Sequence, residues 1–107
     1  MIVAVTGATG FVGTNLISDL VEKGHTVRAL LHSGDTAKES LRARLPPGAD
    51  VEFHQGDVLD PGSLLRAFSG AEVVFHLAAQ ISISRHDAPS VLRVNVEGPK
   101  NVAAACL

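Results

Sequence analysis

Three glycines recur at intervals of three residues near the start of the chain, at Gly7, Gly10 and Gly13. A dinucleotide pyrophosphate requires such a turn, because glycine permits a sharp bend, a close approach of the backbone to the phosphate and close packing of a helix on a strand. The N–H groups and positive dipole at the start of the following helix then attract the phosphate. A glycine triplet alone also fits an ordinary tight turn. Its place between an apolar run and an amphipathic stretch favours nucleotide binding.

The elements that position this turn follow from the hydrophobic pattern. Short apolar runs alternate with longer amphipathic stretches, which is typical of a parallel α/β sheet covered by helices. The predicted strands are Ile2–Thr6, Thr26–Leu31, Val51–Gln55 and Glu72–Ala78. The predicted helices are Phe11–Lys23, Asp35–Leu45, a third that starts at Asp60-Pro61 and stops at Gly70, and Asp87–Leu107. In doubly wound sheets ligands bind at the carboxyl ends of the strands, so we expect the site there.

Three details of these elements are specific predictions. Leu64, Leu65 and Phe68 are expected to form the buried stripe of the third helix. The run Val73-Val74-Phe75 predicts a strand that is buried on both faces. Pro99 lacks a backbone N–H and crowds the carbonyl four residues earlier, so we expect a kink or break in the last helix.

The composition excludes several kinds of partner and site. Nine Lys and Arg against eleven Asp and Glu give a net charge of −2, which offers no electrostatic attraction for nucleic acid. The single cysteine, Cys106, excludes an internal disulfide, and the histidines show no metal-ligand spacing with it or with one another. No apolar run approaches the roughly 18 residues of a membrane span, and Met1–Val5 lacks signal-peptide features, so we expect a cytoplasmic location.

The glycine spacing and three further segments resemble the extended short-chain dehydrogenase/reductase family, also called NAD-dependent epimerase/dehydratases. These segments are Gly56-Asp57-Val58, the run from Val74 to Ala79, and Asn95-Val96-Glu97-Gly98, and they occur in the family's order. The resemblance implies a Rossmann-type doubly wound parallel sheet with the strand order 3-2-1-4. Residues 1–107 would then form the N-terminal part of a dinucleotide-binding domain, without a substrate domain.

The resemblance also implies where a bound NAD(P) would lie. The turn that holds the pyrophosphate would comprise Gly7, Thr9, Gly10, Phe11, Val12 and Gly13. Asp57 would accept a hydrogen bond from the adenine amino group, beside the Val58 backbone, although Gly56-Asp57 also fits a simple strand-end turn. The floor under the ribose and nicotinamide would be formed by Leu77, Ala78 and Ala79. Asn95 would approach the cofactor from the next helix, and as a bare residue it equally fits a helix-surface amide.

The tip of the second strand bears on the choice between NAD and NADP. An acid there binds the ribose 2′-OH of NAD, whereas a basic residue nearby accommodates the 2′-phosphate of NADP. In this chain Leu31 fills the acid position and is followed by His32 and Ser33. Histidine stands where NADP-using relatives often carry arginine, and Ser33 and Lys38 are placed to reach a phosphate. We therefore expect NADP to be favoured over NAD, with a pH dependence that histidine introduces.

No residue of the predicted site is catalytic. The family transfers a proton with a Tyr-x-x-x-Lys pair, and this chain contains no tyrosine. Ser82 and Ser84 follow the fourth strand, but no base stands beside them in sequence, so neither is expected to be a nucleophile. Whether the chain belongs to an active enzyme is open at this point.

The resemblance implies the NAD(P)-binding part of an oxidoreductase or epimerase that acts on a small molecule, a sugar nucleotide or a related hydroxy or keto compound. Val27–Leu31 and the residues after it favour dihydroflavonol reductase-type members. One alternative is a non-catalytic NADP-binding sensor of the atypical short-chain class, and another is an interaction domain that binds no nucleotide. The order 3-2-1-4 leaves the apolar fourth strand at an edge, so we expect the isolated chain to dimerise or aggregate there.

Overall fold

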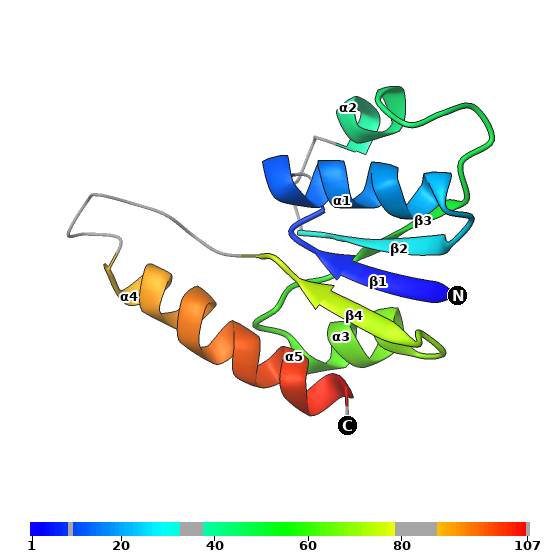
Figure 1. Ribbon diagram of the computed structural model, residues 1–107. Helices are drawn as coiled ribbons and strands as arrows, with labels where there is room; N and C mark the ends of the chain where they lie inside the picture. The colour runs from blue at the N-terminus through cyan, green and yellow to red at the C-terminus, as the bar shows by residue number, and fades with distance from the viewer. Residues whose placement is uncertain (9, 33–37, 79–87, 107) are drawn as a thin grey trace.

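The computed structural model describes residues 1–8, 10–32, 38–78 and 88–106, and its centre is a four-stranded parallel sheet (Figure 1). The strands are β1 (Ile2–Thr6), β2 (Thr26–Leu31), β3 (Val51–Gln55) and β4 (Val73–His76). Their order is β3-β2-β1-β4, which confirms the predicted Rossmann-type arrangement. Leu31 pairs with Gln55, and Thr6 with His76, so the carboxyl ends of all four strands meet at one edge.

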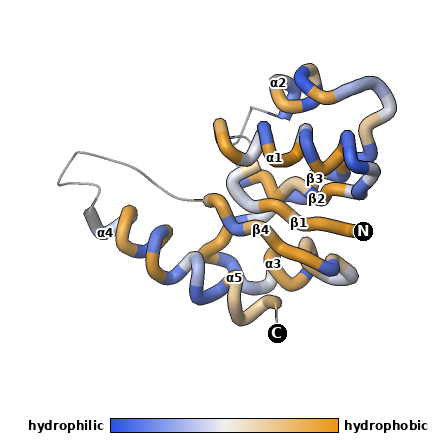
Figure 2. Tube along the Cα trace, viewed as in Figure 1, coloured by the Kyte–Doolittle hydropathy of each residue, from blue (hydrophilic) through white to orange (hydrophobic). Residues whose placement is uncertain are grey.

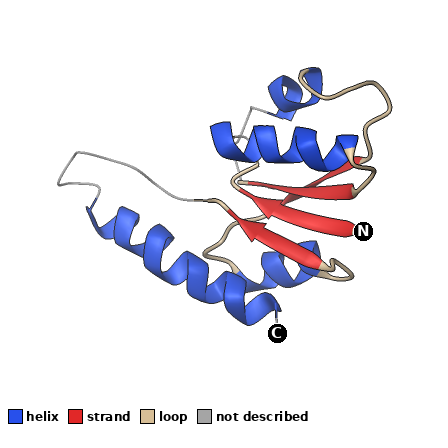
Figure 3. Cartoon of the chain, viewed as in Figure 1, coloured by secondary structure: helices blue, strands red, loops and turns tan. Residues whose placement is uncertain are grey.

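Helices cover both faces of this sheet (Figure 3). They are α1 (Phe11–Glu22), α2 (Lys38–Ala43), α3 (Pro61–Phe68), α4 (Ala88–Leu92), a π-helical segment (Arg93–Glu97) and α5 (Gly98–Cys106). On the face covered by α1 and α2, Val3, Val5 and Val27 of the sheet pack around Ile17 of α1, which is fully buried. The other core joins Ala4 and Leu30 to α3 and α5 through Leu64, Phe68 and Val102. Figure 2 shows hydrophobic residues along β1 and β4, which is typical of a parallel sheet with helices on both faces.

Local backbone conformation and capping hydrogen bonds explain where α1 begins and ends and where α3 begins. The helix α1 starts directly after Gly10, and Gly24 follows it in the left-handed conformation at φ +87°, donating to the Val21 carbonyl at 3.0 Å. The helix α3 has Asp60 as its N-cap, whose Oδ1 accepts from the Gly62 N–H at 3.1 Å, and Pro61 occupies its first turn. These starts and stops agree with the sequence predictions.

Two burial predictions are wrong. Leu65 is 59% exposed, and the buried face of α3 is formed by Leu64, Ala67 and Phe68, because Leu65 points about 100° away from Leu64 around the helix. Val73 and Phe75 are each 37% exposed. They lie on the same face as Val3 and Val5, their partners in β1, but β4 is the edge strand and α1 packs over β1 and β2.

The last helical region contains the expected irregularity. A π-helical turn, Arg93–Glu97, separates α4 from α5 immediately before Gly98-Pro99. A π turn shifts the hydrogen-bonding pattern by one residue, which accommodates the missing N–H of proline. Gly98 is needed at this point, because a Cβ there would lie 2.9 Å from Val58 Cγ2.

The second predicted helix ends two residues earlier than expected, as Lys38–Ala43 with Leu41 buried, and residues 35–37 lie outside the described residues.

Candidate functional site

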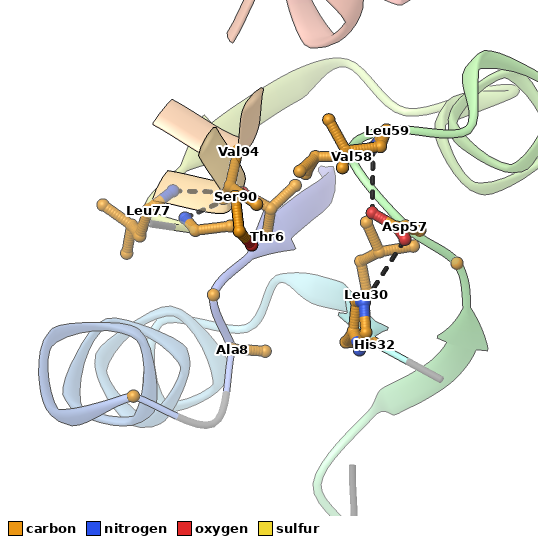
Figure 4. A pocket seen from close by; sticks show the side chains of 14 residues that line it. Thr6, Ala8, Leu30, His32, Asp57, Val58, Leu59, Leu77, Ser90 and Val94 are labelled. Atoms are coloured by element: carbon orange, nitrogen blue, oxygen red, sulfur yellow. Dashed lines mark hydrogen bonds and ion pairs between the residues drawn. The ribbon is translucent and has the colours of Figure 1, made fainter. Parts of the chain in front are cut away.

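A cavity of about 550 Å³ opens at the carboxyl ends of the strands (Figure 4). Its walls come from the β1–α1 turn, the ends of β2 and β4, the loop after β3, and the α4 region. The lining residues are Thr6, Gly7, Ala8, Gly10, Leu30, His32, Gly56, Asp57, Val58, Leu59, Leu77, Ala78, Ser90 and Val94. Most of this wall is apolar, with polar groups concentrated at His32, Asp57 and the glycine turn. Ligand pockets of folded proteins have this size and character.

The glycine-rich turn is built so tightly that side chains are excluded from two of its three glycines. Gly7 has φ +69°, and a Cβ there would lie 2.6 Å from the Leu77 carbonyl carbon. A Cβ at Gly13 would lie 2.1 Å from the Gly7 carbonyl oxygen, so the first turn of α1 packs directly on the glycine turn. Gly10 tolerates more, since its nearest neighbour would be 3.4 Å away. The start of α1, with its unpaired N–H groups, is thereby fixed beside the cavity.

The hydroxyl of Thr6 fastens the end of β4 to this turn. Thr6 is 1% exposed, and its Oγ1 accepts from the backbone N–H groups of Leu77 and Ala78 at 3.1 and 3.2 Å. The same oxygen lies 2.7 Å from His76 Nδ1. Because Oγ1 already accepts twice, its own proton is donated to Nδ1, and His76 carries its proton on Nε2.

Burial lowers the pKa of His76 below the ordinary value of 6.5. Its Nε2 is buried and has no hydrogen-bond partner among the described residues. His76 is thus a neutral imidazole whose hydrogen bond is made through Nδ1. The hydrogen bonds of the Thr6 hydroxyl therefore hold the backbone of residues 77 and 78 beside Gly7, where both residues line the cavity.

Asp57 serves as a turn residue and also faces the cavity. Its Oδ1 accepts from the Leu59 N–H at 2.9 Å, and its own N–H donates to Ser63 Oγ at 3.0 Å. Its Oδ2 lies 3.3 Å from His32 Nε2, across the gap between the ends of β2 and β3. The two sequence interpretations of Asp57 are thus compatible, because one carboxylate oxygen forms the turn and the other lines the site.

Two other basic residues, one on α2 and one within β2, lie away from the cavity. Lys38 Nζ stands 5.1 Å from the centre of the Phe53 ring and does not line the cavity. The Nε of Arg28 lies 3.3 Å from Glu52 Oε2, and its Nη1 donates to the carbonyls of Ala67 and Ser69. His32, with 67% of its side chain exposed, is therefore the basic group that the structure places at the cavity.

The structure brings together seven of the fifteen site residues predicted from sequence. Those that line the cavity are Gly7, Gly10, His32, Asp57, Val58, Leu77 and Ala78. Phe11 and Val12 are 83% and 61% exposed beside it, Gly13 is buried beneath Gly7, and Asn95 is exposed on the π-helical segment. Thr9, Ser33 and Ala79, together with Ser82 and Ser84, lie outside the described residues.

Several lining residues were not predicted. Thr6 and Ala8 belong to the glycine-rich segment, and Leu30 ends a predicted strand, so their positions were within reach of the sequence pattern. Ser90 and Val94 line the cavity only because α4 and the π-helical segment lie across the end of the sheet. No local signal encodes that placement.

A family model described as the NAD-dependent epimerase/dehydratase family matches residues 3–107. The chain belongs to this family. It is 37% identical over 100 residues to a putative dihydroflavonol 4-reductase of Synechocystis, covering 94% of this chain and 27% of that protein. Cinnamoyl-CoA reductase 1 of rice is 38% identical over 106 residues, covering 97% of this chain and 30% of that protein.

Solved structures of this family have the same fold as the chain. The NAD complex of UDP-glucose 4-epimerase from Thermus thermophilus matches with a TM-score of 0.79 and 34% identity, covering 99% of this chain and 33% of that one. The chain thus spans about a third or less of the length of these relatives.

Among the described residues of this family member, no three or more His, Cys, Asp or Glu side chains are grouped as metal ligands. In the same part of the chain, no helix has both the length and the apolar character needed to cross a membrane. In the part of the chain that the structure describes, the titratable side chains that line the cavity are His32 and Asp57, both at the end beside β2 and β3.

Proposed function

We propose that residues 1–107 form the N-terminal part of a dinucleotide-binding domain, and that the cavity holds the adenosine and pyrophosphate of NAD(P). The observation that carries this proposal is the glycine turn. Gly7 is left-handed and touches the end of β4, while Gly10 opens onto the cavity at the start of α1. A backbone cradle that excludes side chains suits a phosphate, which needs N–H donors at close range.

The residues around the cavity fit the remaining parts of the cofactor. Asp57 Oδ2 is an acceptor for the adenine amino group, and Leu30, Val58 and Leu59 supply apolar surface for the adenine ring. The backbone of Leu77 and Ala78, fixed by Thr6, closes the side of the cavity toward β4. NAD(P) supplies hydride transfer when it is bound, and this chain's residues hold and orient it.

NADP is the proposed preference. The tip of β2 has Leu31 where a carboxylate would select NAD, and His32 follows at the cavity. Lys38 lies over Phe53, so the phosphate contact rests on His32 among the described residues. NAD is the alternative, and the Thermus epimerase is a relative whose structure was solved in complex with it.

We propose that the whole protein is a reductase or epimerase of a hydroxy or keto compound. Dihydroflavonol and cinnamoyl-CoA reductases among the relatives support a reductase. The Tyr-x-x-x-Lys pair would then stand outside residues 1–107, which contain no tyrosine. The second candidate is a sensor that binds NADP without turnover and needs no such pair. The sequence that encodes the residues after position 107 distinguishes the two.

Titration of the chain with NADPH and NADH, followed by calorimetry or cofactor fluorescence, tests the binding proposal. We expect saturable binding of at least one cofactor, and loss of binding in Gly7→Ala, whose new Cβ would meet the Leu77 backbone at 2.6 Å. Gly24→Ala is the matched control: Gly24 has φ +87°, and a Cβ there would meet nothing within 4 Å. It carries similar backbone strain without touching the site. A folded chain that binds neither cofactor would refute the proposal and favour an interaction domain.

A further inference from the structure

A histidine and a carboxylate face each other at the mouth of the cavity. His32 Nε2 lies 3.3 Å from Asp57 Oδ2, and both residues line the cavity (Figure 4). The pairing follows from the sheet, because Leu31 is in register with Gln55 and the Gly56 N–H donates to the Leu31 carbonyl at 2.8 Å. The residues that follow the two strand ends are therefore held side by side.

The two partners differ in how firmly they are held. Asp57 is fixed by the Leu59 N–H on Oδ1 and by Ser63 on its backbone, and 36% of its side chain is exposed. The His32 side chain is 67% exposed, and Asp57 is its paired group. A carboxylate offers about four acceptor positions, so Asp57 can hold His32 and accept from an adenine amino group at once.

Several other charged side chains on the neighbouring elements have partners of their own. On β3, Glu52 contacts both His54 and Arg28 at 3.3 Å. On α2, Lys38 and Arg42 both lie over the Phe53 ring, at 5.1 and 4.8 Å from its centre. Asp57 is thus the charged group that faces His32 among the described residues; Asp35 lies outside them.

We propose that the His32–Asp57 pair makes the choice between NADP and NAD depend on pH, an inference that rests on the proposed function. A 2′-phosphate bound beside His32 is a second anion next to Asp57. When His32 is protonated, its charge stands between the two anions and attracts both. When His32 is neutral, that attraction is lost and the Asp57 carboxylate repels the phosphate. The uncharged 2′-OH of NAD responds weakly to either state.

The sign of the effect follows from this arrangement. Histidine changes its charge between about pH 5 and pH 8, so the affinity for NADPH relative to NADH falls as the pH rises through that range. The 2′-phosphate that NADPH brings beside His32 favours the imidazolium, so binding of NADPH is coupled to uptake of a proton. An exposed ion pair contributes up to about a factor of five in affinity, so a change of about three- to five-fold in the ratio is expected.

The experiment measures the ratio of dissociation constants for NADPH and NADH at about pH 6 and about pH 8.5, by calorimetry. His32→Arg keeps a permanent charge and reports how far titration of the cofactor's own phosphate contributes, since that phosphate has a pKa near 6. His32→Gln removes the charge. His25→Gln is the matched control, because His25 precedes β2 at the opposite end of the strand.

We expect the relative preference of the chain for NADPH to fall three- to five-fold between the two pH values, measured against His32→Arg. His32→Gln should have the low preference at both pH values, and His25→Gln should behave like the unchanged chain. Equal pH dependence of the unchanged chain and His32→Gln would overturn the inference while leaving cofactor binding intact. Absence of binding to both cofactors would instead overturn the proposed function beneath it.

Discussion

Replacing Thr6 by valine is expected to weaken the fold more than the loss of a single hydroxyl usually does. Valine has the same shape as threonine, so packing at this 1% exposed position is preserved. The Ala78 N–H and His76 Nδ1 each lose their Thr6 oxygen, at 3.2 and 2.7 Å, while the Leu77 N–H keeps the Thr6 carbonyl at 3.2 Å. Two partly buried polar groups are thus left short of a partner.

The structure sets the size of this effect. Each unsatisfied buried group costs about 1–3 kcal/mol, and both of these lie in partly buried surroundings, so Thr6→Val should lower the free energy of unfolding by about 2–4 kcal/mol. Thr6→Ser retains the hydroxyl and loses one methyl group, which costs about 1 kcal/mol. Thr14→Val is the matched control, since Thr14 is 6% exposed and its hydroxyl donates to the Ala8 carbonyl at 3.3 Å.

Urea unfolding followed by far-ultraviolet circular dichroism is the suitable assay, because the chain has no Trp or Tyr to report by fluorescence. The expected order of stability is unchanged chain, then Thr6→Ser and Thr14→Val, then Thr6→Val. If Thr6→Val is no less stable than Thr14→Val, the Thr6 hydrogen bonds between β1 and β4 do not contribute about 2–4 kcal/mol to the free energy of unfolding.

Two further outcomes follow from the same region. Burial lowers the pKa of His76, so the unfolded chain binds more protons below the ordinary value of 6.5; the stability supplied by the neutral imidazole is present above that pH and declines as the pH falls below it. Melting temperatures at about pH 7.5 and pH 5.5 should therefore differ more for the unchanged chain than for His76→Gln, and superimposable profiles would contradict this. The second outcome concerns β4, which pairs with β1 alone among the described strands and exposes 37% each of Val73 and Phe75. Light scattering should detect dimers or larger species that Phe75→Lys reduces and Leu65→Lys, on the exposed face of α3, does not; a strictly monomeric chain would refute it.

Local chemistry made much of this fold predictable. The glycine triplet and the Asp60-Pro61 start of α3 each act within a few residues, and the structure places both as the sequence indicated. The parallel order of the strands follows from the alternation of elements along the chain, which restricts the possible topologies.

Contacts between distant residues set the limit of prediction. The Thr6–His76 bond joins residues 70 positions apart, and the His32–Asp57 pair depends on the register of β2 against β3. The exposure of Phe75 depends on what packs over an edge strand, which its own apolar sequence does not specify. The same reason explains why Ser90 and Val94 could not be assigned to the cavity in advance.

The loop that carries Asp57 is held by both helices on its side of the sheet. Ser63 of α3 accepts from the Asp57 N–H at 3.0 Å, and Asn101 of α5 donates to the Val58 carbonyl at 2.9 Å, where Gly98 lets the last helix approach. The loop that forms the proposed adenine end of the cavity therefore takes this geometry only when α5, which lies more than forty residues further along the chain, is packed against it.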